Sequence, residues 1–291
     1  MPCEDYLIAS SVEEALATLA CMHGEARLIA GGTDLYIQLM RNERRVETLV
    51  DITRIPGLSE IRQEHSLLTI GACVTWSEIE RSPMIRARAT VLAQAAAHIG
   101  GPQIRNVGTI AGNVVNAQPA ADGSIALLAL DAEAEIANLT GRQWVPLRTL
   151  FIRPGVSRVD AGAELVTGFR FRAHGPREAS AYERIARRRA LALPVLNVAA
   201  RVLLDASREN IRDAWVAIGP VALVPFRAEQ TEAALRGQPA TADTIAEAAR
   251  VAVSESRPRS SLLRASKGYR RELIAVLVRR ALQRAINDAR K

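Results

Sequence analysis

The chain has 291 residues, of which 48% are hydrophobic and 24% are charged. That length and composition can bury a substantial core in two or three compact units, and they do not fit a disordered chain. No run of 18 apolar residues occurs, and the N-terminus lacks a basic segment followed by an apolar one, so we expect no membrane span and no secretory signal peptide.

The net charge of +7 arises mainly at the C-terminal end, where residues 257–291 hold eleven Lys or Arg and two acidic residues. A nucleic-acid surface is one interpretation of such a segment. However, its one aromatic residue, Tyr269, offers no platform on which bases could stack. A solvated helix face or a docking face for an acidic partner fits better, and we expect no nucleic-acid partner.

Cysteine and histidine are sparse and scattered. Cys3, Cys21 and Cys73 are odd in number, which favours reduced thiols and a cytoplasmic location. Three cysteines are too few for an iron–sulfur cluster, which needs about four thiolates. The histidines show no metal-site spacing and no serine-hydrolase elbow occurs, so the sequence predicts neither a metal site nor a catalytic side chain. An enzyme whose cofactor supplies the chemistry is favoured.

The first predicted unit, residues 1–57, is a small α/β arrangement. A helix that begins near Ser10 or Ser11 precedes a strand over residues 27–30, a helix over residues 35–41 and a strand over residues 48–52. This β-α-β pattern places a glycine turn at the carboxyl end of a strand, where open α/β sheets bind ligands.

That turn reads Ala30-Gly31-Gly32-Thr33-Asp34. Glycine lets the backbone adopt positive φ and approach a ligand without a Cβ in the way. Thr33 or Asp34 can cap the following helix, whose free N–H groups form an anion site.

The second predicted unit, residues 58–175, contains another glycine stretch, Val107 to Val114, in which Gly108 and Gly112 bracket small residues and Asn113 supplies an amide. Two separated turns of this kind suit a dinucleotide with a pyrophosphate bridge. Neither matches a nucleotide-binding fingerprint, so a pair of ordinary β-turns is the alternative.

The other elements predicted in this unit are a strand pair over 58–62 and 67–70, a short helix from Thr75 or Ser77, a helix over 85–99, and strands over 133–139 and 164–171.

The third predicted unit, residues 176–291, is an antiparallel sheet with helices. Strands are predicted over 182–189, 197–204 and 211–218, and helices over 228–236, 242–253 and 269–289.

Together, the two glycine stretches resemble those of the FAD-binding medium subunit of the molybdenum hydroxylases, the xanthine dehydrogenase and carbon monoxide dehydrogenase family. Ala30 to Asp34 matches the family's Ala-Gly-Gly-x-Ser/Asp turn. Thr109 to Asn113 matches its Thr-Ile-Gly-Gly-Asn turn, with Ala111 in place of the first glycine. The resemblance extends over the whole layout, including the segment from Arg264 to Arg271 before the last helix. It implies an α+β fold, with a two-part FAD-binding domain of the vanillyl-alcohol oxidase type and a C-terminal α+β domain built on a three-stranded antiparallel sheet.

The resemblance also implies a site for FAD. Asp122 would hydrogen-bond the flavin or ribityl hydroxyls, Ile99 and Leu165 (or Val166) would contact the ring system, and Arg184 would bond the ring carbonyls. A plain helix N-cap is the alternative for Asp122, and an ordinary core position is the alternative for Ile99 and Leu165. The pyrophosphate cradle would consist of Ala30, Gly31, Gly32, Thr33, Asp34, Thr109, Ile110, Ala111, Gly112 and Asn113.

The function implied by the resemblance is that of the FAD subunit of a heteromeric molybdenum hydroxylase. A large partner would carry the molybdenum cofactor and a small partner the [2Fe–2S] clusters, in a dimer of heterotrimers. Electrons would leave for NAD or another acceptor; the loop from Ala190 to Pro194 departs from the family pattern and leaves that acceptor open. The alternatives are a self-contained FAD oxidase of the vanillyl-alcohol oxidase type, for which no His/Tyr/Arg cluster is evident, and a non-catalytic scaffold.

Overall fold

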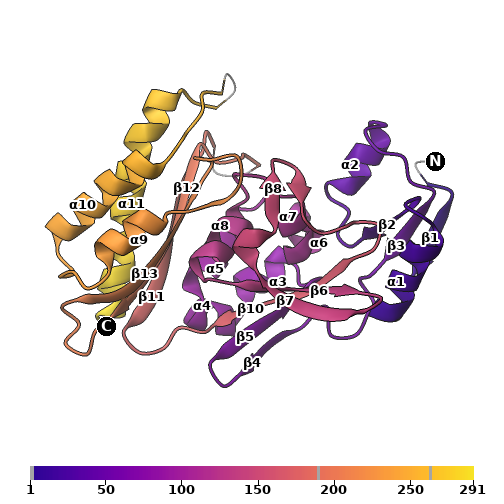
Figure 1. Ribbon diagram of the computed structural model, residues 1–291, viewed down its shortest axis with the longest axis horizontal. Helices are drawn as coiled ribbons and strands as arrows, with labels where there is room; N and C mark the ends of the chain where they lie inside the picture. The colour runs from indigo at the N-terminus through magenta and orange to yellow at the C-terminus, as the bar shows by residue number, and fades with distance from the viewer. Residues whose placement is uncertain (1–2, 189–190, 262–263) are drawn as a thin grey trace.

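The computed structural model describes residues 3–188, 191–261 and 264–291. The predicted strand over 182–189 and the departing loop 190–194 therefore each extend into residues outside the described part. Figure 1 shows three units in a row along the long axis, with the N-terminal unit at one end and the C-terminal unit at the other.

The N-terminal unit is a three-stranded parallel sheet in the order β1-β3-β2. Ser11 caps the first helix, as predicted, by accepting from the Glu14 N–H at 3.0 Å. Strand β1 was not predicted, because its four side chains are all exposed and show no alternation of buried and exposed positions. The elements are β1 (Asp5–Ile8), α1 (Val12–Cys21), β2 (Ala26–Ile29), α2 (Leu35–Met40) and β3 (Thr48–Asp51).

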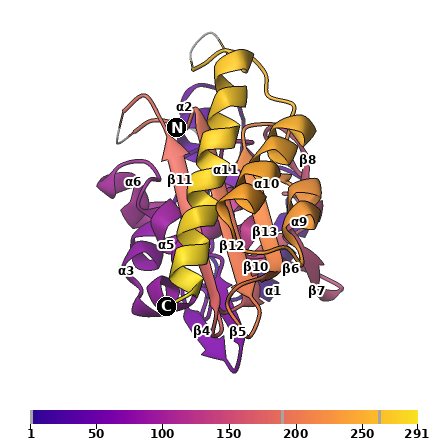
Figure 2. The same ribbon diagram turned by 90° about the vertical axis from the view of Figure 1, so that its left-hand side faces the viewer.

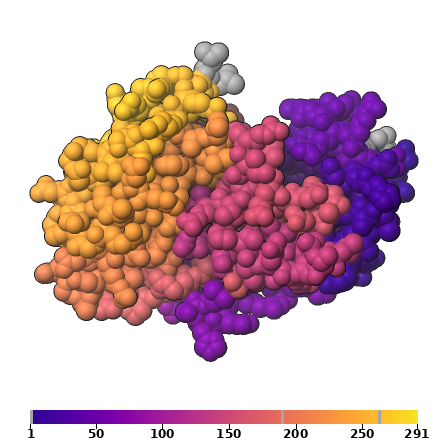
Figure 3. Space-filling model, in the orientation of Figure 1, coloured from indigo at the N-terminus to yellow at the C-terminus, as the bar shows by residue number. Residues whose placement is uncertain are grey.

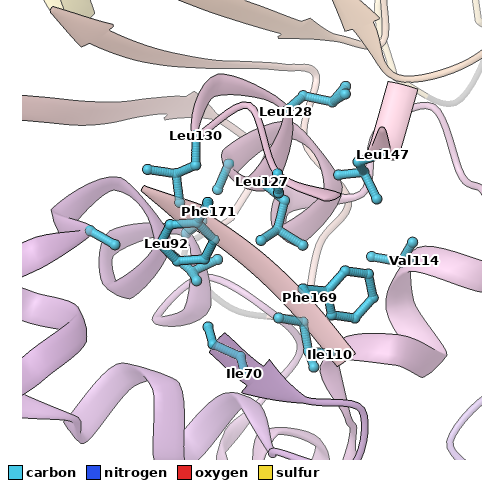
Figure 4. Close-up of a cluster of buried hydrophobic side chains, with 14 of the residues drawn as sticks. Ile70, Leu92, Ile110, Val114, Leu127, Leu128, Leu130, Leu147, Phe169 and Phe171 are labelled. Atoms are coloured by element: carbon cyan, nitrogen blue, oxygen red, sulfur yellow. The ribbon is translucent and has the colours of Figure 1, made fainter. Parts of the chain in front are cut away.

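The central unit is a five-stranded antiparallel sheet in the order β4-β5-β10-β6-β7, covered on one face by helices. Figure 4 shows its core, where Phe169 and Phe171 of β10 and Ile70 of β5 lie among apolar side chains of the helices. The strands are β4 (Ile61–Glu64), β5 (Leu67–Gly71), β6 (Glu133–Asn138), β7 (Gly141–Pro146) and β10 (Leu165–Arg172), and β8 (Phe151–Arg153) and β9 (Val156–Ser157) form a separate hairpin. The helices are α3 (Trp76–Arg81), α4 (Pro83–Arg88), α5 (Thr90–Ala96), α6 (Pro102–Val107), α7 (Ile110–Val115), α8 (Asp122–Ala129) and the 3₁₀ turn Leu147–Thr149.

Two expectations for this unit need correction. The helix predicted over 85–99 is broken at Ala89, which leaves the helical region with φ −155°. The N–H of Val91 then donates to Ser180 Oγ of the C-terminal unit at 3.0 Å, so a contact between units replaces a helical hydrogen bond. The stretch from Val107 to Val114 is not a β-turn: it runs from the last residue of α6 through Gly108 and the N-cap Thr109 into helix α7.

The C-terminal unit is an antiparallel sheet in the order β11-β12-β13-β14, in which a two-residue strand extends the three predicted ones. Helix α11 lies across β11 and β12 on the outer face (Figure 2), and α5 and α8 pack against the inner face. The elements are β11 (Glu178–Ile185), β12 (Leu196–Leu204), β13 (Ile211–Gly219), β14 (Phe226–Arg227), α9 (Glu229–Leu235), α10 (Ala242–Glu255) and α11 (Lys267–Ala289). No helix in the described part of the chain is long and apolar enough to cross a bilayer.

Candidate cofactor site

A cavity of about 450 Å³ is lined by the N-terminal and central units together. The turn after β2 lines it from the first unit, and the start of α7 and the β8–β9 hairpin line it from the second. In Figure 3 the upper edge of the molecule dips between the violet residues of α2 and the yellow C-terminal residues, with residues of the central unit at the bottom of the dip. Neither unit alone encloses this space.

The two glycine stretches are in direct backbone contact. A Cβ added at Gly31 would lie 1.9 Å from the carbonyl oxygen of Val107, and 3.0 Å from the Cα of Gly108. Only glycine allows this approach, because every other residue carries a Cβ that would overlap backbone atoms. The predicted pairing of the two stretches at one site is therefore present in the fold.

The first turn offers unused donors to the cavity. Within the described part of the chain, no hydrogen bond is formed by the backbone N–H of Gly31, Gly32, Thr33 or Asp34. Gly32 adopts φ +65°, a conformation that favours glycine and that turns successive N–H groups toward one side. Asp34 occupies the N-cap position of α2 but its side chain makes no capping bond, so the capping role expected of Thr33 or Asp34 is not found.

The backbone N–H groups of the second glycine stretch do not join the predicted pyrophosphate cradle. The N–H of Ile110 donates to Val74, the N–H of Ala111 donates to Ala72, and the N–H of Gly112 donates to Thr109 Oγ1. These donors are already paired, so they do not add to an anion cradle. What α7 presents to the cavity is the exposed backbone of Gly112 beside Asn113, whose buried Oδ1 has no partner among the described residues.

The structure brings all but three of the predicted site residues to the cavity wall. Ile110 lies in the core of the central unit with its side chain fully buried. Asp122 and Arg184 do not line the cavity and form an ion pair in a polar cluster between the central and C-terminal units. The residues at the wall are Ala30, Gly31, Gly32, Thr33, Asp34, Ile99, Thr109, Ala111, Gly112, Asn113 and Leu165.

The polar cluster centres on Asp122, the first residue of α8. Its Oδ1 accepts from Tyr182 Oη and from Asn197 Nδ2, the latter at 3.1 Å, and Arg184 Nε lies 3.1 Å away. Burial raises the pKa of Asp122, and Arg184 and the two hydrogen bonds oppose that rise. Burial together with the Asp122 charge raises the pKa of Tyr182 well above its usual value. Asp122 is thus a buried junction between units, and the plain N-cap alternative is excluded because Ala121 is the N-cap.

Some lining residues carried no signal in the sequence. Arg27 and Arg44 add positive charge to the first unit's side of the cavity, and Gly155 and Ser157 reach it from the β8–β9 hairpin. Nothing in their local sequence marks them, since they come from separate parts of the chain that only the tertiary structure brings to one cavity.

The residues present fit FAD. Free N–H groups at the carboxyl end of β2, with Arg27 and Arg44 nearby, suit the two negative charges of a pyrophosphate. Apolar walls suit flat ring systems. The walls are built from Leu28, Ile29, Ile52, Ile99, Ile104, Val115, Val156, Val159, Leu165 and Val166. The described residues contain no group of three or more His, Cys, Asp or Glu that could hold a metal ion.

Comparisons with known proteins agree with this geometry. The model of the "FAD binding domain in molybdopterin dehydrogenase" matches residues 2–171, and that of the "CO dehydrogenase flavoprotein C-terminal domain" matches residues 180–285. The chain is 33% identical over 289 residues to the 6-hydroxypseudooxynicotine dehydrogenase complex subunit alpha of Paenarthrobacter nicotinovorans, covering 99% of this chain and 96% of that protein. It is 30% identical to the carbon monoxide dehydrogenase medium chain of Hydrogenophaga pseudoflava, covering 97% and 96%.

Solved structures give the same result. A structure of the Hydrogenophaga pseudoflava carbon monoxide dehydrogenase superimposes with a TM-score of 0.91 at 31% identity, covering 98% of this chain and 97% of that one. Quinoline 2-oxidoreductase from Pseudomonas putida 86 superimposes with a TM-score of 0.89 at 25% identity, covering 99% and 98%. The similarity therefore spans all three units. With the glycine cradle, this shows that the chain belongs to the family of FAD-binding medium subunits of the molybdenum hydroxylases, the xanthine dehydrogenase and carbon monoxide dehydrogenase type.

Proposed function

We propose that this chain is the electron-transfer subunit of a three-component molybdenum hydroxylase. It would accept electrons from [2Fe–2S] clusters on a small partner and deliver them to NAD or another acceptor, while a large partner oxidises the substrate at a molybdenum cofactor. The observation that carries this proposal is the cradle at Gly31 to Asp34, packed against Val107 and Gly108, in a chain whose relatives are named as subunits. A dimer of such heterotrimers is the assembly we expect.

Bound FAD supplies the redox chemistry, because it exchanges electrons singly with iron–sulfur clusters and in pairs with hydride acceptors. The residues of this chain bind and orient it. The N–H groups of Gly31 to Asp34 would hold the pyrophosphate, and Ile99 and Leu165 would keep water from the ring system. The ion pair of Arg184 and Asp122 would fix the region where the central and C-terminal units meet.

One feature supports a cytoplasmic location, and another supports assembly with partner subunits. Cys3, Cys21 and Cys73 are free thiols, which fits a reducing compartment. The basic C-terminal segment, residues 257–291, suits a docking face for an acidic partner subunit.

The first test is reconstitution of the purified chain with FAD, followed by gel filtration and a visible spectrum. We expect a flavin band that stays with the protein. A chain that is folded by circular dichroism but retains no flavin would contradict the proposal.

The second test uses the complex obtained by co-expression with the two partner subunits. In the complete complex, substrate should reduce both the iron–sulfur clusters, followed by electron paramagnetic resonance, and the acceptor. After removal of the flavin, cluster reduction should persist and acceptor reduction should stop. A flavin-free complex that still reduces the acceptor at the original rate would overturn the assigned role.

A further inference from the structure

A second cavity, of about 240 Å³, shares no lining residue with the flavin cavity and carries a concentration of positive charge. It is bounded by the loop Gln118–Ala120, by the chain just after β13, and by the segment that leads into α11. Arg259, Arg264 and Arg270 all line it, and no acidic residue does. Arg264 and Arg270 belong to the segment that the sequence marked before the last helix, and neither of them lines the flavin cavity.

Arg270 is the unusual member of this group. The residue is only 4% exposed, and its Nε is buried without a hydrogen-bond partner within the described ranges. An arginine is almost never buried unless it is paired, because taking its charge out of water costs free energy. The pKa of Arg270 is lowered, first by burial and then by the charges of Arg264 and Arg259. The side chain is therefore held in place without a counter-charge.

No carboxylate in the described part of the chain supplies the missing negative charge. Across the described residues, no ion pair involves Arg259, Arg264 or Arg270. Three like charges around one small cavity repel one another, and for the buried Arg270 no described carboxylate offsets that repulsion. An anion in the cavity would do so for all three at once.

We propose that the cavity formed by Arg259, Arg264 and Arg270 is an oxyanion site that binds one phosphate group, either free or carried by a nucleotide. Guanidinium groups bind phosphate through paired, charge-assisted hydrogen bonds, and this is the chemistry for which arginine is best suited. Ser260 and Ser261, whose hydroxyls are neutral donors, also line the cavity.

The size of the cavity limits the ligand. A space of about 240 Å³ is smaller than the roughly 300–1,000 Å³ typical of sites that enclose a whole drug-sized ligand. It suits a single tetrahedral oxyanion, or one phosphate of a larger molecule whose remainder lies outside.

The position of the site links it to the cofactor region without depending on it. The loop Gln118–Ala120 joins α7, which lines the flavin cavity, to α8, which begins at Asp122. An anion held there would brace this loop against the C-terminal unit. The inference goes beyond the proposed function and does not rest on it, since the arginine cavity shares no lining residue with the flavin cavity.

The experiment is a titration of the full chain by isothermal calorimetry, with saturating FAD present so that the flavin cradle is not available to the probe. Inorganic phosphate and ADP are used as separate probes at constant ionic strength, with chloride as the blank. We expect phosphate to bind, and Arg264→Ala and Arg270→Lys each to weaken it about tenfold or more, because each removes charge-assisted hydrogen bonds. Tighter binding of ADP than of phosphate would identify a nucleotide as the source of the group.

The matched control is Arg271→Ala, which removes the same charge one residue away on an exposed position that does not line the cavity. It should leave binding unchanged. Arg259→Ala, at an exposed position of the cavity, provides a second variant with little risk to folding, and circular dichroism checks each protein. The proposal is overturned if neither probe binds the folded wild-type chain, or if Arg271→Ala weakens binding as much as Arg264→Ala does.

Discussion

At the scale of single residues, the flavin cavity depends on the close contact between the backbones of Gly31 and Val107. Gly31 sits against the carbonyl of Val107, and the turn that follows it leaves its N–H groups without partners inside the described part of the protein. The sequence indicated that a glycine was needed there, but it did not show which atoms a side chain would meet. That information came from the packing of one unit on another.

Replacing Gly31 by alanine tests this contact. The new Cβ would lie 1.9 Å from the Val107 oxygen, so the turn must move away and its N–H groups must leave the position proposed for the pyrophosphate. We expect FAD affinity to fall on the order of tenfold or more, since charge-assisted hydrogen bonds are lost, as measured by fluorescence titration of the apoprotein. The control is Gly268→Ala, at the start of α11, where an added Cβ meets nothing within 4 Å. Equal affinity of the Gly31 variant and the wild type would contradict the account of the cradle.

His174 is a buried residue whose protonation should govern acid stability. Burial, together with the positive charge of Arg201, lowers its pKa from 6.5 to about 4. Folding therefore keeps the ring neutral while the unfolded chain binds a proton below about pH 6.5, so stability falls as the pH drops toward 4.

Between pH 7.5 and pH 5 this residue should cost the folded state about 2 kcal/mol. Urea unfolding of wild type and His174→Gln at both pH values measures it, because glutamine does not titrate. The variant should lose about 2 kcal/mol less than the wild type over that interval. His65→Asn, at an exposed position with φ +54° that asparagine tolerates, should lose as much as the wild type. Equal losses in all three proteins would refute the assignment.

At the scale of elements, the helix starts show why some predictions from sequence succeed. Thr75 begins α3 with a capping box: its hydroxyl accepts from the Glu78 N–H, and the Glu78 carboxylate accepts from the Thr75 N–H at 2.7 Å. Such signals are local, so the sequence predicts them well. The break at Ala89 depends instead on Ser180, far away in the chain, and no local pattern reveals it.

The capping box can be tested by Thr75→Ala and Thr75→Ser. Loss of the hydroxyl leaves the Glu78 N–H without its partner, and we expect the free energy of unfolding to fall by about 1 kcal/mol. Serine keeps the hydroxyl and should stay within about 0.5 kcal/mol of the wild type. Thermal or urea unfolding of the three proteins gives the comparison, and an alanine variant as stable as the serine variant would show that the box contributes nothing.

At the scale of the whole molecule, buried polar groups join the central and C-terminal units. Arg201 of β12, which pairs with Glu178 of the neighbouring strand β11, donates across the boundary to the carbonyl of Leu130 at 3.0 Å. Asn197 likewise donates to the carbonyl of Ala120 at 3.3 Å. With the Asp122 cluster, these bonds fix the two units against each other. A chain that loses one of them leaves a charge or a donor buried without a partner.

The variant Arg201→Met removes the positive partner of a carboxylate whose side chain is fully buried. Arg172 remains beside the same Glu178 oxygen, Oε1, but its side chain is half-exposed. We expect a loss of about 3 kcal/mol in the free energy of unfolding. Arg212→Met, at an exposed position of β13, is the matched control and should change little. A difference of less than about 1 kcal/mol between the two variants would mean that the buried pair is not important for stability.

The sequence by itself determined the α+β class, most of the helices and strands, and the two glycine stretches with the family they resemble. These features are encoded locally, in periodicity, caps and turn residues, and so they can be read without the fold. Strands β1 and β7 were not predicted, because their mostly exposed side chains show no alternation of apolar and polar positions. Only the tertiary structure decided that Ile110 faces the core, that Asp122 and Arg184 pair with each other outside the cavity lining, and that the β8–β9 hairpin lines the cavity. It also decided that three arginines of the C-terminal segment surround one small space, because burial and proximity depend on contacts between residues far apart in the chain.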